Sequence, residues 1–409
     1  MVEKYICANG VRIVHEKMPY VRSAALGIWV EAGSGDESES EAGIAHFIEH
    51  MLFKGTPTRS ARTIAEEFDR IGGDINAFTS KEMTCYSATV LGHHASHALE
   101  VMADMFFNSS FNALEIAKEK SVVLDELAVV EDTPDDDVDE RLWSIMYPNQ
   151  PIGRPVLGYT ETIETFDKQM IEQFMARLYT PERIVISVAG NYDEQLIQQI
   201  EAYFGSFHRE EVKVASILSL PEFHGGVKEK LKDIEQAHIC IGFQGLAVRD
   251  KRMHGLTVLD SIIGGTMSSR LFQEVREERG LAYSVYSYYS AYKTTGAFVI
   301  YGGTSPENLQ EMTMTIDRII DSVVDKGITD NELYNAKEQL KGGFLLGLES
   351  SEARMHRNGR SELILQAHKT IDEVVALIDG VQADQVHNVA MDIFTQQRAI
   401  SMIVPEDLA

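Results

Sequence analysis

The stretch FMARLYTPERIVISVAGN, residues 174–191, joins an amphipathic helical pattern to a run of apolar, strand-forming residues. It is echoed near the C-terminus by VAMDIFTQQRAISMIVPE, residues 389–406. In both copies a threonine precedes an arginine by three positions, and these arginines, Arg183 and Arg398, lie 215 positions apart. The pattern indicates that one structural unit occurs twice in the chain.

A second pair of stretches recurs at nearly the same distance. LGIWVEAG, residues 26–33, precedes a helical pattern that starts at Gly43, and ICIGFQG, residues 239–245, precedes one that starts at Gly255. The two glycines lie 212 positions apart. Because the two distances nearly agree, the sequence predicts two similar halves. Chance similarity between two stretches of mixed secondary structure is the alternative that this weak echo leaves open.

Residues 1–208 form the first half in this prediction, residues 227–409 form the second, and a linker at 209–226 joins them. The linker contains one proline and a pair of adjacent glycines, which interrupt regular structure. Strand patterns alternate unevenly with amphipathic helical stretches, and consecutive strands near residues 76–91 favour antiparallel pairing. We therefore expect an α+β fold with mostly antiparallel sheets rather than a doubly wound parallel sheet.

Composition narrows the classes of protein. Of the 409 residues, 44% are hydrophobic and 24% are charged, as in ordinary globular domains, so disordered and fibrous proteins are excluded. Sixty-three acidic residues against 37 basic ones give a formal net charge of -26. This charge repels nucleic acid and anionic membrane surfaces and favours cationic partners.

The N-terminal sequence and the cysteines indicate in which cellular compartment the protein is expected. The chain opens with MVEKYICANGVRIV, which lacks the basic segment and long apolar run of a secretory signal. No stretch approaches the roughly 20 apolar residues of a membrane helix. Cys7, Cys85 and Cys240 are too few and too far apart for a disulfide framework. We expect a soluble protein of the reducing cytoplasm that does not bind membranes.

The segment GIAHFIEHML, residues 43–52, carries the strongest chemical signal. On a helix, His46 and His50 share one face, so both imidazoles can bind a single Zn²⁺. Glu49 stands beside that metal, and the HxxEH order is that of the inverted zincins. Zinc lowers the pKa of a bound water to about 7, and an adjacent carboxylate can accept its proton. A chance set of solvated polar residues is the alternative, but the apolar neighbours indicate a buried helix, in which polar groups need partners.

A hydrolytic zinc site needs a third protein ligand and one open position. The segment NALEIAKEKSVVLDELAVV, residues 112–130, has helical periodicity, and its Glu119 and Glu126 fall on one face. Glu126 is the candidate ligand, with Glu119 as a brace. On spacing alone, a charged face exposed to solvent is the simpler interpretation of these two glutamates.

The chain resembles the M16 family of zinc peptidases, which includes pitrilysin, insulin-degrading enzyme and the mitochondrial processing peptidase. The resemblance rests on GIAHFIEHMLFKGT at residues 43–56, on NAFTSKEMTCY at 76–86 and on RGLAYSVYS at 279–287, in the family's order. Glu126 follows His50 by 76 residues, which is the family's spacing. The resemblance covers nearly the whole chain.

This resemblance implies two homologous halves, each with a mostly antiparallel sheet flanked by helices, and one Zn²⁺ per chain in the first half. In it, His46, His50 and Glu126 would bind the metal. Glu49 would act as general base, and Glu119, at the family's second acidic position, would orient the ligands.

The second half is expected to contribute substrate contacts instead of metal ligands. In the register of the repeat, the positions of the two histidines and the catalytic glutamate are taken by Val258, Ser261 and Ile262. Arg276 and Tyr283 match the family's pair that reaches the substrate, and Tyr283 could donate a hydrogen bond to the tetrahedral oxyanion. Without the resemblance, this pair would be interpreted as packing residues.

Two more pairs of residues are implied to bind substrate. Asn76 and Ala77 match the family's edge strand, to which an extended peptide adds by main-chain pairing. Asp136 and Glu140 follow Glu126 by ten and fourteen residues, where processing peptidases hold a basic residue of the substrate. For these acids, a solvated helix start with aspartates near the positive end of the helix dipole is the alternative.

Together these inferences predict a zinc endopeptidase that hydrolyses unfolded peptides, basic or presequence-like, in an enclosed chamber, with the chains paired as a homodimer. A non-catalytic scaffold or partner-dependent subunit of the same fold is the alternative, and so is a maturation peptidase with one substrate.

Asp36 stands where many relatives carry arginine, so a salt bridge at that position is in doubt. His93, His94 and His97 are expected at the surface and not in a second metal site.

Overall fold

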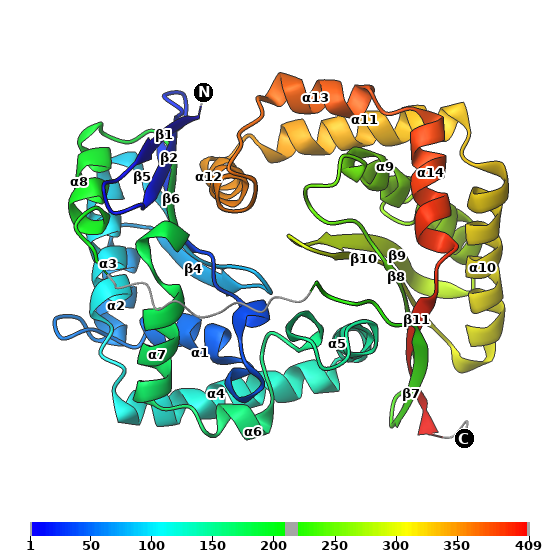
Figure 1. Ribbon diagram of the computed structural model, residues 1–409, viewed down its shortest axis with the longest axis horizontal. Coiled ribbons are helices and arrows are strands. Elements are labelled where there is room, and N and C mark those ends of the chain that lie inside the picture. The colour runs from blue at the N-terminus through cyan, green and yellow to red at the C-terminus, as the bar shows by residue number, and fades with distance from the viewer. Residues whose placement is uncertain (1, 209–219, 407–409) are drawn as a thin grey trace. The chain divides into compact units, whose positions relative to one another are not determined.

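A computed structural model describes residues 2–208 and 220–406 (Figure 1). The chain divides into two compact units. Unit 1 comprises Met1–Ala128, Arg154–Ile217 and Leu346–Lys369, and unit 2 comprises Val129–Gly153, Leu218–Leu345 and Thr370–Ala409. Most of the predicted linker, at residues 209–219, lies outside the described residues.

Unit 1 is built on a six-stranded sheet with the order β1-β2-β6-β3-β5-β4. The β2 and β6 strands run parallel to each other, whereas the other neighbours pair antiparallel. The strands are β1 (Glu3–Ile6), β2 (Arg12–Lys17), β3 (Ser23–Val30), β4 (Asp74–Thr79), β5 (Thr84–Leu91) and β6 (Ile184–Gly190).

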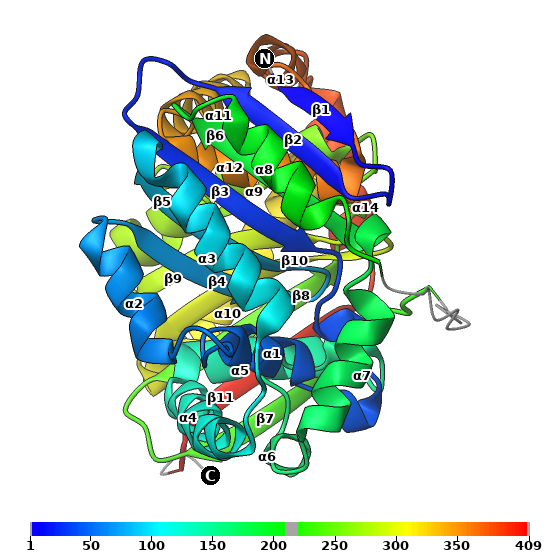
Figure 2. The same cartoon turned by 90° about the vertical axis from the view of Figure 1, so that its left-hand side faces the viewer.

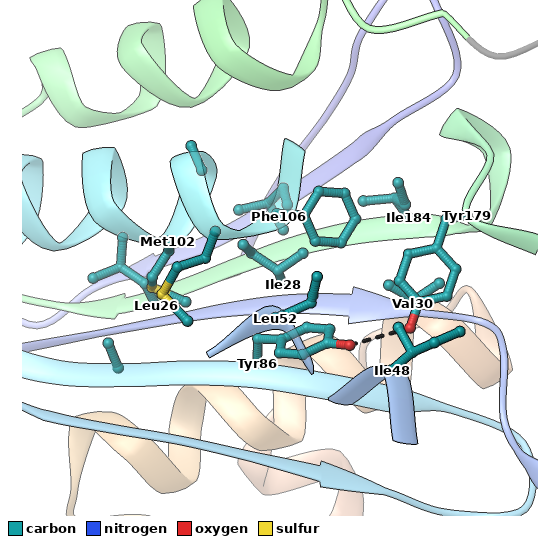
Figure 3. Packing of buried hydrophobic residues seen from close by; sticks show 14 of the residues in the cluster. Leu26, Ile28, Val30, Ile48, Leu52, Tyr86, Met102, Phe106, Tyr179 and Ile184 are labelled. Atoms are coloured by element: carbon teal, nitrogen blue, oxygen red, sulfur yellow. Dashed lines mark hydrogen bonds between the residues drawn. The ribbon is translucent and has the colours of Figure 1, made fainter. Parts of the chain in front are cut away.

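One face of this sheet is covered by helices from the first half of the chain, with α3 and α8 lying across the strands (Figure 2). The helices of unit 1 from this half of the chain are α1 (Ile44–Leu52), α2 (Ala61–Arg70), α3 (Ala95–Asn108), α4 (Ala113–Asp132), α6 (Thr160–Ile163), α7 (Lys168–Leu178) and α8 (Gln195–Phe204). Figure 3 shows the core between them, where Leu26, Ile28 and Val30 of β3 meet Ile48 and Leu52 of α1. The period of two along β3 therefore directs its even-numbered residues toward this core.

The opposite face of the sheet is covered by α12 (Ser351–Arg360), which comes from the second half of the chain (Figure 1). Gly359 lies directly against the indole of Trp29, where a Cβ atom would come within 2.1 Å of Trp29 Nε1. The Asn358 amide donates to Glu16 at 2.9 Å, and Arg354 forms a salt bridge with the same carboxylate at 3.0 Å. Because both faces of β3 are covered, nearly every residue of that strand is buried.

Unit 2 repeats this design in a five-stranded sheet with the order β7-β11-β8-β10-β9. The β7 and β11 strands are parallel, and the remaining neighbours are antiparallel. This order matches β2-β6-β3-β5-β4 of unit 1 strand by strand. The strands are β7 (Gly226–Lys232), β8 (Ala237–Gln244), β9 (Ala282–Ala291), β10 (Gly296–Thr304) and β11 (Arg398–Pro405). The predicted α+β fold with two similarly built halves is confirmed.

The helices of unit 2 also cover both faces of its sheet. They are α5 (Pro134–Met146), α9 (Met253–Ile263), α10 (Leu309–Lys326), α11 (Asp330–Gly347), α13 (Ile371–Asp379) and α14 (Ala383–Phe394). One apolar cluster joins α9, α10 and α14 to the sheet. A second cluster joins α5, which belongs to the first half of the sequence, to β8 and β11.

Each sheet therefore buries one face under a helix from the other half of the chain. The division of the chain into two homologous halves and a linker, at 1–208, 227–409 and 209–226, stays a prediction. The compact units differ from these halves because α5 belongs to unit 2 and α12 belongs to unit 1. None of the helices within residues 2–208 and 220–406 combines the length and apolar composition needed to cross a bilayer.

A buried acid on α9 gives a test of packing in unit 2. The Asp260 carboxylate accepts a hydrogen bond from Ser287 Oγ at 2.6 Å, and burial raises the pKa of Asp260 to about 6. Because the ordinary value is about 3.9, the folded state holds the proton more tightly, and stability falls as pH rises from about 4 to 6. Asp260→Asn keeps an acceptor oxygen without charge. We expect it to raise the free energy of unfolding at pH 8 by up to about 3 kcal/mol.

Urea unfolding of both proteins at pH 4 and pH 8 measures this effect. Asp125→Asn, at an exposed position in the interior of α4, is the matched control and should change stability at neither pH. A gain for Asp260→Asn that is equal at the two pH values would show that its carboxyl titrates normally in the folded protein.

Candidate metal centre

The helix α1 has a fixed starting point. Its N-cap, Gly43, has a φ of +93° and no side chain, and a Cβ atom there would come within 2.4 Å of the Leu157 carbonyl oxygen. The buried carboxylate of Glu37 accepts the backbone N–H groups of Gly43 and Ala45, both at 2.8 Å. Glu37 thus supplies the acceptors that a serine or aspartate supplies in an ordinary N-cap.

The two histidines of α1 present the same ring nitrogen to one carboxylate. The rings of His46 and His50 lie 4.6 Å apart between centroids, and their Nε2 atoms lie 3.7 and 3.6 Å from Glu126 Oε2. These three donor atoms lie within 4.8 Å of one another, as in a metal-binding group. Zn–N and Zn–O bonds of about 2.0–2.2 Å in a tetrahedron separate ligand atoms by a little less than these distances, so the set fits one zinc ion.

A second glutamate of α4 determines which nitrogen of His50 is available. Nδ1–H of His50 donates to Glu119 Oε1 at 2.7 Å, and the ammonium of Lys54 contacts Glu119 Oε2 at 2.6 Å. Burial raises the pKa of Glu119, but His50 and Lys54 lower it by more, so the net shift is downward. The proton on Nδ1 leaves the Nε2 lone pair of His50 free for a metal.

Their surroundings shift the pKa values of the two histidines in opposite directions. Burial, reinforced by the charge of His50, lowers the pKa of His46 to about 4. The imidazole is therefore neutral near pH 7, which is its ligating form. For His50, burial lowers the pKa, but the hydrogen bond and charge of Glu119 raise it by more. Within the described part of the chain, the buried Nδ1 of His46 has no hydrogen-bond partner.

Glu49 lies on α1 beside these donors without being one of them. Its carboxylate accepts a hydrogen bond from Thr79 Oγ1 at 2.5 Å. Burial raises the pKa of Glu49, and the Thr79 hydroxyl opposes that shift. A carboxylate with a raised pKa, held close to a metal site, suits the role of general base.

Both glutamates of α4 turn toward α1. Glu119 is only 3% exposed, so the interpretation of this helix face as solvent-exposed is wrong for that residue. Glu126 remains partly exposed, so its carboxylate lies where the site meets solvent. In unit 2, α9 takes the place of α1, and it buries Val258, Ser261 and Ile262 at the corresponding positions. None of these three side chains is a zinc ligand.

The structure places Asn76 and Ala77 on β4, the edge strand of the six-stranded sheet. Among the described residues, β4 pairs with β5 alone. The side chain of Asn76 accepts the N–H of Ala77 at 2.8 Å, so it occupies a main-chain donor that does not pair with the neighbouring strand. An added peptide strand could replace that contact.

In unit 2, Arg276 and Tyr283 lie together. The guanidinium of Arg276, in the π-helical segment Phe272–Glu278, lies 4.8 Å from the ring centroid of Tyr283 and 4.7 Å from that of Phe272. Tyr283 is 81% exposed, so the alternative of a tyrosine packed in the core is wrong. Its hydroxyl is accessible to a ligand.

The acids of α5 divide into two groups. Asp137 pairs with Lys230 at 2.7 Å and with Arg141 at 2.6 Å, which ties the helix to its own unit. Asp136 is exposed overall, but partial burial of its carboxyl group and the charge of the neighbouring Asp135 raise its pKa. Glu140 is half-buried on the same helix. A role in substrate binding stays a prediction for Asp136 and Glu140.

The remaining polar features of unit 1 are structural. His97 lies 3.3 Å from Glu67, and the rings of His93 and His94 pack against each other. No second group of metal-ligating side chains occurs in residues 2–208 and 220–406. Asp36 forms a salt bridge with Arg183 at 3.0 Å, so a salt bridge does occur at the position where the departure from arginine put one in doubt.

Sequence reasoning missed Glu37, Lys54 and Thr79. Glu37 caps α1 from six residues before Gly43, farther away than the usual capping patterns reach. Lys54 follows His50 by one helical turn, which is a usable signal for a shared partner once Glu119 is known. The contact of Thr79 depends on how β4 packs on α1, which local patterns do not specify.

This fold and site define a duplicated α+β protein with an inverted-zincin helix in one half. Residues 12–160 match the family described as Insulinase (Peptidase family M16), and residues 165–340 match Peptidase M16 inactive domain. The chain belongs to the M16 peptidase family, as its resemblance predicts, and it is of the short bacterial type.

Known proteins are similar over almost their full length. The uncharacterized zinc protease YmxG of Bacillus subtilis is 49% identical over 99% of this chain and 98% of its own. An uncharacterized zinc protease of Rickettsia felis is 37% identical over 98% and 97%. Two solved structures share the fold. A protease from Helicobacter pylori has a TM-score of 0.92 at 21% identity and covers 99% of each chain. A peptidase M16 inactive domain from Pseudomonas fluorescens has a TM-score of 0.90 at 20% identity, over 99% of this chain and 98% of its own.

The hydrogen bond between Glu119 and His50 is expected to strengthen zinc binding. Glu119→Gln should weaken zinc binding by about 10- to 100-fold, because a neutral amide no longer favours the His50 tautomer that offers Nε2. Competition against a chromophoric chelator measures the dissociation constant. Glu115→Gln, on the same helix but at a half-buried carboxylate that pairs with Lys118, is the control and should bind zinc as the wild type does. Equal affinities for all three proteins would remove Glu119 from the metal centre.

Proposed function

We propose that this M16 family member is a zinc-dependent endopeptidase with one Zn²⁺ per chain. The observation that carries the proposal is the convergence of His46 Nε2, His50 Nε2 and Glu126 Oε2, with the Glu49 carboxylate alongside. Zinc, when bound there, supplies a Lewis acid and lowers the pKa of a bound water to about 7.

The protein's own residues divide the remaining work. Glu49 accepts the proton of the attacking water and passes it to the leaving amine, for which its raised pKa suits it. Glu119 and Lys54 hold His50 in the ligating tautomer. The exposed hydroxyl of Tyr283, oriented by the guanidinium of Arg276, donates a hydrogen bond to the developing oxyanion.

The substrates in this proposal are unfolded peptides that are basic or presequence-like. An extended peptide adds to the open edge of β4 by main-chain pairing at Asn76 and Ala77, which excludes folded proteins. The net charge of -26 attracts basic chains, and Asp136 and Glu140 on α5 bind basic side chains.

The proposed setting is a cytoplasmic homodimer that encloses the peptide in a chamber. Cys7, Cys85 and Cys240 are unpaired and buried, which suits a reducing compartment.

Cleavage of quenched peptides of mixed charge tests the proposal. The wild type should cut, with preference for basic peptides, and both Glu49→Gln and a chelator should abolish cutting. Removing the general base should cost at least about 100-fold in kcat while zinc content stays at one ion per chain. Initial rates across the panel, together with metal analysis, give these values.

Glu39→Gln, at an exposed site before α1, is the matched control and should cut like the wild type. If metal-loaded wild type cuts no peptide, the protein is a non-catalytic or partner-dependent member of its family. If Glu49→Gln cuts as well as the wild type, Glu49 is not the general base and the proposed mechanism is wrong.

A further inference from the structure

Thr79 is the last residue of β4 and lies on the face of that strand that meets α1. Alternation along the strand directs Ile75 and Ala77 toward the core, and Thr79 shares their side. Its Oγ1 approaches Glu49 Oε2 at 2.5 Å. The edge strand and the candidate general base are therefore joined by one side-chain contact.

The hydrogen bond between Thr79 and Glu49 has a defined donor and a defined acceptor. An ionised carboxylate only accepts hydrogen bonds, so the hydroxyl of Thr79 is the donor. The neighbouring hydroxyl of Thr84 lies 3.4 Å from Thr79 Oγ1, but it donates its proton to the Ala32 carbonyl at 2.9 Å. The single hydroxyl proton of Thr79 is thus committed to Glu49.

The backbone on both sides of the contact is held by one loop. Ser34 and Gly35 donate their N–H groups to the carbonyls of Ser80 and Lys81, in the turn that follows β4. In the same loop, Glu37 caps the start of α1. The strand that carries Thr79 and the helix that carries Glu49 are therefore fixed to the same segment, so their separation cannot drift easily.

We propose that Thr79 is a positioning residue for Glu49 and that it couples the orientation of this carboxylate to the strand on which the peptide is expected to bind. The inference rests on the proposed peptidase function. The hydroxyl holds Oε2 against β4 and leaves Oε1 as the oxygen that exchanges protons with the reacting groups. Without it, the carboxylate turns more freely and loses part of its pre-organisation.

Thr79→Val removes the hydroxyl at nearly constant shape. We expect kcat to fall by about 10-fold or more, with KM, zinc content and zinc affinity unchanged, because the loss acts on the base and not on binding. Thr79→Ser keeps a donor and should recover kcat to within about 3-fold of the wild type. Thr89→Val makes the same change at the other end of the same strand pair, and it should leave kcat unchanged.

A second readout separates positioning from substrate binding. In a Glu49→Gln background, which does not turn over, fluorescence titration with an uncut peptide should give the same Kd with and without Thr79→Val. If Thr79→Val fails to fold, the comparison of Thr79→Ser with Thr79→Ala decides the question, because these two differ in the hydroxyl alone.

The outcomes distinguish this inference from the proposed function. Equal kcat for wild type and Thr79→Val overturns the positioning role while the peptidase stands. A raised KM at constant kcat, or a loss of zinc, also overturns it, since Thr79 would then act in binding or at the metal. A wild type that cuts nothing overturns the peptidase and this inference together.

Discussion

The buried carboxylate of Glu119, shared between His50 at 2.7 Å and Lys54 at 2.6 Å, is the contact on which the rest of the site depends. It determines the tautomer of His50 and so directs a lone pair toward the metal. It also docks α4 against α1, and because Glu126 lies two helical turns further along the same face, this docking brings Glu126 to both histidines.

Around this contact, most polar groups of a helix buried in an apolar core have partners, and among the described residues His46 Nδ1 is an exception. The free N–H groups at the start of α1 bind Glu37, and Glu49 accepts the hydroxyl of Thr79. Buried polar groups normally have partners. The Nε2 atoms of His46 and His50 are left facing a single carboxylate oxygen, an arrangement that one zinc ion would satisfy.

The sequence predicted the short-range parts of this arrangement and missed the long-range ones. On any helix, the spacing of His46, Glu49 and His50 places these side chains on neighbouring positions of one face. The same period places Glu119 and Glu126, seven residues apart, on one face of their helix. The repeat around Arg183 and Arg398 reappears as the matching strand order of the two sheets. The contacts made by Thr79 and Glu37, and the exchange of α5 and α12 between the halves, depend on tertiary packing that no local pattern encodes.

Anomalous diffraction at the zinc absorption edge, from crystals of the zinc-loaded protein, tests the central claim most directly. We expect one ion per chain, about 2.0–2.2 Å from His46 Nε2, His50 Nε2 and one carboxylate oxygen of Glu126. Glu119 should stay on His50 Nδ1 and outside the coordination sphere. An ion bound through Nδ1 of either histidine, an ion ligated by Glu119 in place of Glu126, or no peak at these residues would contradict the account.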